Sequence, residues 1–160
     1  MKPTVRVIGL GQRVAGDDGV GLAVVDELCS RGVADDVDLV AVSDASDLPW
    51  LLGDVETVVM VDAASTNGPS GQVLQLSLDE LRDAEVRPVS THGLGVVAAV
   101  ELANLLNLST AELKVHVVCI TIEQPREFTT TLSSRVSAAV PVAVDLVFEL
   151  IGGKACTNPK

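Results

Sequence analysis

Two acidic positions and one histidine lie where α/β proteins usually carry their functional residues. Asp17 and Asp18 follow a short apolar run and a glycine-rich loop, Asp62 follows a second apolar run, and His92 precedes an apolar helical stretch. In an open parallel sheet, ligands bind outside the carboxyl ends of the strands, so we expect these side chains to converge on one rim. Carboxylate and imidazole donors together suit a divalent transition metal.

Each of these residues also has an ordinary structural explanation. Asp17 or Asp18 could cap the helix that follows, or lie in its first turn, where negative charge is favoured. Asp62 could begin a turn, and His92 could be a partly buried residue at a helix start. Their joint placement at the ends of three elements favours a shared site.

The glycine-rich loop supports a second hypothesis, a small-molecule binding domain of the dinucleotide type. The dinucleotide fingerprint needs glycine at a third motif position, which is Val14 here, although Asp44 lies where a ribose-binding acid would stand. A P-loop is disfavoured because two aspartates, rather than Lys and Ser or Thr, follow Gly16. Two carboxylates at that helix start would also oppose a phosphate. Dinucleotide binding is therefore the stronger of two weak nucleotide hypotheses.

Nucleophilic catalysis finds no support in the sequence. No Gly-x-Ser-x-Gly elbow is present. Cys29, Cys119 and Cys156 fall in a predicted helix, a predicted strand and the C-terminal tail, and no two have metal-clip or redox-motif spacing. His116 also falls in a predicted strand, so we expect it to be a core residue.

The elements that must position these residues alternate between strand and helix. Short apolar, β-branched runs predict strands, and an apolar period of three to four residues predicts helices. The predicted strands are 4–8, 38–42, 57–61, 72–76 and 114–120, and the helical stripes are Val20, Val24 and Leu28, then Leu94, Ala98 and Leu102, then Val136, Val140, Val144, Val147 and Ile151. This order predicts an α/β three-layer sandwich with a central, mainly parallel twisted sheet of about five strands and helices on both faces. The more polar strand 72–76 is expected at an edge, where antiparallel pairing is open to it.

The length of 160 residues corresponds to about one domain. We expect residues 1–153 to form that domain and residues 154–160 to form a loose C-terminal tail. The charged stretch 79–91 is expected to be a short helix and a loop. The last helix is expected to begin at a Ser133 cap and to kink near Pro141.

Composition restricts the partners. Asp and Glu number 22 against 11 Lys and Arg, for a net charge of −11, and no basic residue occurs between Gly32 and Leu81. Nucleic acid and anionic membrane surfaces are therefore unsuitable partners. No stretch has the apolar length of a signal peptide or a membrane span, so a soluble, cytoplasmic protein is expected. The sequence leaves the oligomeric state open.

Two pairs of motifs and one further segment occur in a fixed order along the chain. They are Val7–Gly11 with Gly16–Gly21, Val58–Ala63 with Gly68–Val73, and the segment Ser90–Gly95. In order and spacing this set resembles the hydrogenase maturation endopeptidases, which process the large subunit of nickel-iron hydrogenases. The resemblance extends over nearly the whole chain.

The resemblance implies a cytoplasmic protease that removes a C-terminal extension from the hydrogenase large-subunit precursor once nickel has been inserted. It assigns the family's catalytic and metal-contacting positions to Asp18, Asp62 and His92. The nickel would be carried by the substrate, and another divalent cation could take its place. A catalytically silent member that docks on the precursor as a chaperone is a third hypothesis.

Two departures from the family pattern are present. Gln12 stands where the family usually has Asn, and Ser43–Ser46 stands where many members have an Asp-Gly-Gly-Thr loop. The loss of two glycines restricts the backbone of that loop. Asp44 also adds a carboxylate that could face the same rim.

Overall fold

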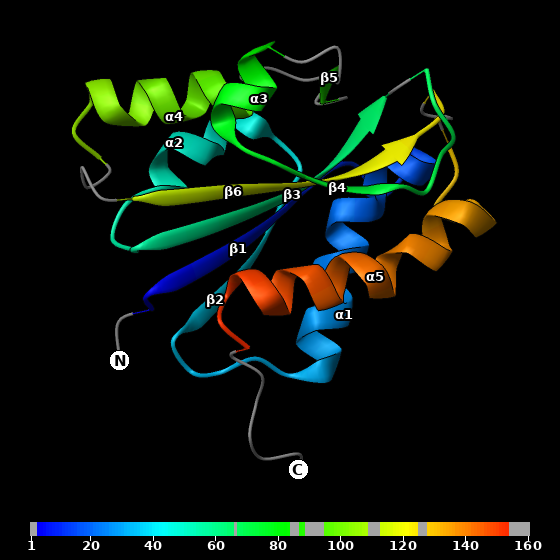
Figure 1. The fold of residues 1–160 in the computed structure, drawn as a ribbon, viewed down its shortest axis with the longest axis horizontal. Coiled ribbons are helices and arrows are strands. Elements are labelled where there is room, and N and C mark those ends of the chain that lie inside the picture. Colours follow the sequence, from blue (N-terminus) through cyan, green and yellow to red (C-terminus); the bar gives the residue numbers. More distant parts are fainter. Residues whose placement is uncertain are drawn as a thin grey trace.

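A mixed β-sheet lies between two layers of helices in the computed structural model, which describes residues 3–65, 67–83, 87–88, 95–108, 113–124 and 128–153 (Figure 1). The strands are β1 Val5–Leu10, β2 Val37–Val42, β3 Thr57–Ser65, β4 Val73–Leu76, β5 Arg87–Pro88 and β6 Lys114–Ile122. The helices are α1 Val20–Arg31, α2 Leu48–Leu51, α3 Leu78–Asp83, α4 Val96–Leu105 and α5 Ser134–Leu150, with 3₁₀ turns η1 Gly16–Gly19 and η2 Ala45–Asp47.

The sheet has the strand order β2-β1-β3-β6-β4. The first four strands are mutually parallel, and β4 runs antiparallel to β6 at the edge. The predicted mainly parallel α/β sandwich is therefore confirmed, together with an antiparallel edge strand. The very short β5, which was not predicted, pairs antiparallel with the end of β3.

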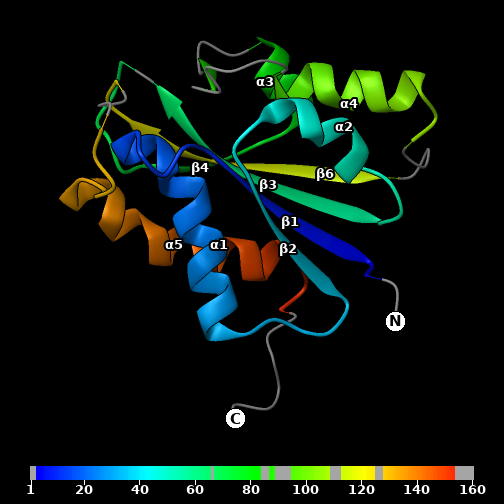
Figure 2. The same cartoon turned by 180° about the vertical axis from the view of Figure 1, so that it is seen from behind.

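The two faces of the sheet carry separate apolar cores. Helices α1 and α5 cover one face, and α2, α3 and α4 cover the other (Figures 1 and 2). The central strands can be almost entirely apolar because both of their faces are buried. No helix in the described part of the chain has both the length and the apolar character required to cross a bilayer.

Two predictions about individual elements were wrong. Leu102 does not belong to a buried stripe of α4, because it is 37% exposed while Val96, Ala99, Val100 and Ala103 are buried. Most of α4 is apolar, so periodicity could not identify the face that meets the sheet. Strand β3 does not end at Val61 but continues to Ser65, because β6 and β5 supply partners for the additional residues.

Helix α5 follows its predicted stripe, with Val136, Val144 and Val147 buried. Its N-cap is Ser133, but the Ser133 side chain makes no capping hydrogen bond. The helix continues through Pro141. The predicted tail, residues 154–160, lies outside the described residues.

Helix α1 packs on the sheet through direct backbone contact at Gly21. A Cβ atom at Gly21 would overlap the carbonyl oxygens of Leu10 and Val61. We therefore expect Gly21→Ala to lower the free energy of unfolding by about 3 kcal/mol or more, as overpacking against a rigid backbone does. Gly95→Ala is the matched control, because a Cβ there meets nothing within 4 Å, and its effect should stay within about 1 kcal/mol. Urea denaturation measures both, and equal effects of the two changes would contradict this packing.

Candidate metal centre

The crevice of the sheet lies between the carboxyl ends of β1 and β3. Strand β1 has β2 on one side and β3 on the other, and the connections through α1 and α2 lie on opposite faces of the sheet (Figures 1 and 2). This arrangement is the topological switch point at which open α/β sheets bind ligands. The turn η1 after β1 brings Asp18 there, and β3 brings Asp62.

Asp62 is a buried carboxylate with one unsatisfied oxygen. The residue is 2% exposed, and it follows Val61, the last β3 residue that pairs with β1. Its Oδ1 accepts a hydrogen bond of 2.8 Å from the Ala63 N–H. In the described structure its Oδ2 is buried and has no hydrogen-bond partner, a condition that is costly unless a cation or donor is supplied.

Burial raises the pKa of Asp62 to about 7, and the negative charge of Asp18 adds to the rise. The Ala63 N–H acts in the opposite direction. The two carboxylates are thus close enough to repel each other. The Asp62 Oδ2, which has no hydrogen-bond partner among the described residues, and the nearby Asp18 carboxylate together form a donor set that fits a divalent cation.

Asp18 is held in place by the glycine-rich loop. It is 4% exposed, and its Oδ2 accepts a hydrogen bond of 2.8 Å from the Gln12 N–H. Gly11 has a φ of 142°, and a Cβ there would overlap the Asp18 carbonyl oxygen. The loop can therefore fold back onto Asp18 only with glycine at this position.

The sequence left Asp17 and Asp18 as alternatives, and the structure gives them different surroundings. Asp17 Oδ1 accepts a hydrogen bond of 2.6 Å from the N–H of Ser133, at the start of α5. Asp17 thus satisfies a helix N-terminus distant in sequence, whereas Asp18 is the acid that interacts with Asp62.

His92 lies outside the described residues, so its position relative to Asp18 and Asp62 stays a prediction. Within the described ranges, no three His, Cys, Asp or Glu side chains are grouped so that they could hold a metal. The carboxylate pair therefore needs a further donor, from His92 or from a ligand.

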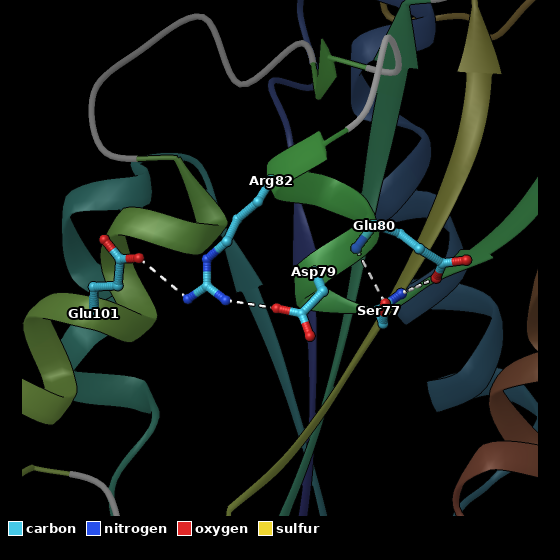
Figure 3. A network of polar contacts seen from close by, with 5 residues as sticks. All are labelled: Ser77, Asp79, Glu80, Arg82 and Glu101. Carbon is cyan, nitrogen blue, oxygen red and sulfur yellow. Dashed lines mark hydrogen bonds and ion pairs between the residues drawn. The ribbon is translucent and has the colours of Figure 1, made fainter.

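The helices that flank the His92 segment in sequence are tied together (Figure 3). Arg82 of α3 bonds Asp79 at 2.7 Å and Glu101 of α4 at 3.1 Å. Ser77 and Glu80 form a reciprocal capping box, with bonds of 2.7 and 3.2 Å. The Arg82–Glu101 ion pair joins α3 to α4, and the other contacts order the start of α3.

Cys119 lies close to the site, which the sequence did not indicate. Cys119 on β6 is the register partner of Asp62 on β3, and both lie on the face that α4 covers. Burial raises the pKa of the Cys119 thiol to about 12, with a smaller contribution from Asp62. Cys119 is therefore a neutral neighbour at pH 7. Only strand register, which the sequence does not supply, could have revealed it.

The dinucleotide alternative loses support from the geometry of the loop. Val14, at the third motif position, is 58% exposed. Asp17 and Asp18 both lie in the first turn of η1, where negative charge opposes a phosphate. Asp44 accepts a hydrogen bond from the Ser46 N–H at 2.9 Å and caps η2.

Comparison with known proteins identifies the family. A family model described as HycI, hydrogenase maturation protease, matches residues 25–150. The chain belongs to this family of hydrogenase maturation proteases. A Methanocaldococcus jannaschii relative, whose name assigns it to the same group, is 29% identical over 96% of this chain and 97% of its own length.

Solved structures of maturation proteases share the fold. The chain is similar to the hydrogenase 2 maturation peptidase from a Thaumarchaeota archaeon, with 28% identity and a TM-score of 0.65 over 92% of this chain and 97% of that one. It is similar in fold to the hydrogenase maturating endopeptidase HybD from E. coli, with 17% identity and a TM-score of 0.75 over 92% and 91% of the two chains.

Gln12 and Ser43, where the resemblance implies departures from the family pattern, touch each other. The Gln12 side-chain amide donates a hydrogen bond of 3.1 Å to the Ser43 carbonyl oxygen. Gln12 therefore links the glycine-rich loop, which also positions Asp18, to the loop 43–46.

Proposed function

We propose that this chain is an endopeptidase that removes the C-terminal extension of a nickel-iron hydrogenase large-subunit precursor after nickel insertion. Membership of the maturation protease family supports peptidase activity in hydrogenase maturation. The observation that carries the finer assignment is the buried Asp62 Oδ2, which has no partner among the described residues and lies near a second acid. Such a pair is complementary to a cation that arrives with the substrate.

In this proposal Asp18 and Asp62, with His92, contact the nickel that the precursor carries. Both carboxylates must be ionised to do so, and a bound cation favours the ionised form of Asp62. The nickel is then a recognition element that distinguishes a loaded precursor from an empty one. The reaction belongs in the cytoplasm, where the precursor would be assembled.

A comparison of nickel-loaded and nickel-free precursor tests this function. We expect the wild-type chain to cleave the loaded precursor and to release its C-terminal peptide, which mass spectrometry identifies. The nickel-free precursor should stay intact. Equal cleavage of both forms would contradict recognition through nickel, and binding of the loaded form without release of a peptide would indicate a docking chaperone.

A further inference from the structure

A polar groove of about 350 Å³ lies at the start of α5. Gly16 and Asp17, which directly precede Asp18, form one wall. Ser70, the two residues that follow β6, the residues that lead into α5 and the first turn of α5 form the rest. The end of β6 and the start of α5 lie at the same end of the sheet in Figure 1. A ligand in the groove would therefore contact Asp17, the residue that precedes Asp18 in the sequence.

The segment 129–132, of which Thr129, Thr131 and Leu132 line the groove, carries backbone groups without partners. Thr129 pairs with Ala15 in an isolated parallel bridge, in which the Gly16 N–H donates to the Thr129 carbonyl oxygen at 2.8 Å. Beyond this bridge, the Thr131 N–H donates to the Thr129 hydroxyl oxygen at 3.3 Å. Leu132, which lines the groove, and Thr130, which does not, have no hydrogen bonds to any residue that the structure describes. Unpaired N–H and C=O groups at such an edge are the groups to which extended peptides add.

The groove also holds a cation without a partner. Arg135 lines it and is exposed. Among arginines with described side chains, Arg135 alone has no carboxylate partner; those with one are Arg6, Arg13, Arg31 and Arg82. In a chain with 22 acidic and 11 basic residues, an arginine in a groove that no carboxylate of the described chain engages is available to bind an acidic ligand.

The other groups in the groove fit a peptide better than a compact anion. Ser70, Thr131 and Ser133 contribute hydroxyl groups, and Glu123 contributes a carboxylate that accepts hydrogen bonds. Asp17 is already engaged with the N–H of Ser133. A peptide supplies both the N–H donors that these acceptors need and a carboxylate for Arg135.

We propose that this groove binds the segment of the substrate that is removed, as an extended chain along residues 130–132, with a carboxylate of that segment on Arg135. The inference rests on the proposed endopeptidase function. The groove has the volume of a small-ligand pocket, so it admits a short stretch of flexible extension but not the folded body of a precursor. Arg135 is a specificity-determining residue in this arrangement.

Steady-state processing of the nickel-loaded precursor tests the role of Arg135. We expect Arg135→Gln to raise KM by about 10-fold or more, the size expected for loss of a hydrogen bond to a charged group, with kcat within about 2-fold because the metal contacts are untouched. Arg135→Lys should recover part of the loss. Arg31→Gln, which removes a paired arginine from α1, is the matched control and should leave KM unchanged. An unchanged KM for Arg135→Gln would overturn the inference.

Binding of a synthetic peptide with the sequence of the extension separates this inference from the proposed function. Chemical-shift changes in the full chain should fall on residues 129–135. The dissociation constant should rise by about 10-fold when the acidic groups of the peptide are amidated, or when its alternate backbone nitrogens are methylated. Equal affinity for all three peptides would overturn the groove assignment. Failure of the wild-type chain to cleave the loaded precursor would instead refute the proposed function, and the peptide titration would still decide the groove.

Discussion

Asp62→Asn, Asp18→Asn and His92→Ala are each expected to lower the rate of processing of nickel-loaded precursor by more than about 100-fold, while the chain still folds. Asparagine preserves the shape of aspartate but removes the charge that complements a cation. Because the Asp62 Oδ2 has no hydrogen-bond partner among the described residues, its replacement breaks no contact of the fold at that atom. Losses of this size accompany removal of one charge-stabilising group from an active site.

The matched control for this prediction is Asp145→Asn. It makes the same chemical change on α5, where Asp145 is 70% exposed and bonds Arg31 at 2.8 Å. Surface ion pairs contribute at most about 1 kcal/mol, so processing and folding should both be retained. Gel analysis of precursor conversion and circular dichroism measure the two properties. Normal cleavage of loaded precursor by all three site variants would contradict the assignment of the site.

The order of strands and helices could be predicted because each element carries a local pattern. The β-branched runs that became β1, β2 and β6 are short and bounded by turn residues, and the period of Val20, Val24 and Leu28 defines α1. The mixed polarity of 72–76 identified an edge strand because an edge leaves one side of the strand without a partner.

Details that depend on contacts between distant segments could not be predicted. Strand β5 is two residues long and exists through pairing with Ala64 and Ser65. The buried face of α4 is set by the sheet beneath it, since its sequence is apolar on more than one face. In both cases the deciding interaction is tertiary, and local propensity carries no signal for it.

Some features of the candidate site could be predicted from the sequence, and others depend on contacts between distant segments. Asp18 and Asp62 could be selected because glycine loops and strand ends mark the rim of a parallel sheet. The different surroundings of Asp17 could not be predicted, because they arise from a hydrogen bond with Ser133, which is 116 residues away in the sequence. The groove at Arg135 was equally hidden, since its walls come from four separate stretches of the chain.

Asp62 is expected to make the metal-free protein less stable as the pH rises from about 4 to about 7. Its pKa is about 7 in the folded chain, against an ordinary value of 3.8, mainly because the residue is buried. Between these values the folded state holds a proton that the unfolded state releases, so the free energy of unfolding falls as pH rises. Each pH unit corresponds to about 1.4 kcal/mol, which gives a total of about 4 kcal/mol.

Asp62→Asn removes this dependence, because the amide does not titrate. Relative to wild type, the variant should gain about 4 kcal/mol between pH 4 and pH 8, and any pH-independent cost of burying the amide cancels in that difference. Asp26→Asn is the control of opposite sign: Arg13 lowers the pKa of Asp26, so this exposed pair should contribute a roughly constant, small stability over the same range. Urea denaturation across pH, with a chelator present, measures the three curves. Parallel curves for wild type and Asp62→Asn would contradict the prediction, because they would show that Asp62 is ionised in the folded chain across this pH range. Asp18 and Asp62 could then both be ionised without an added cation.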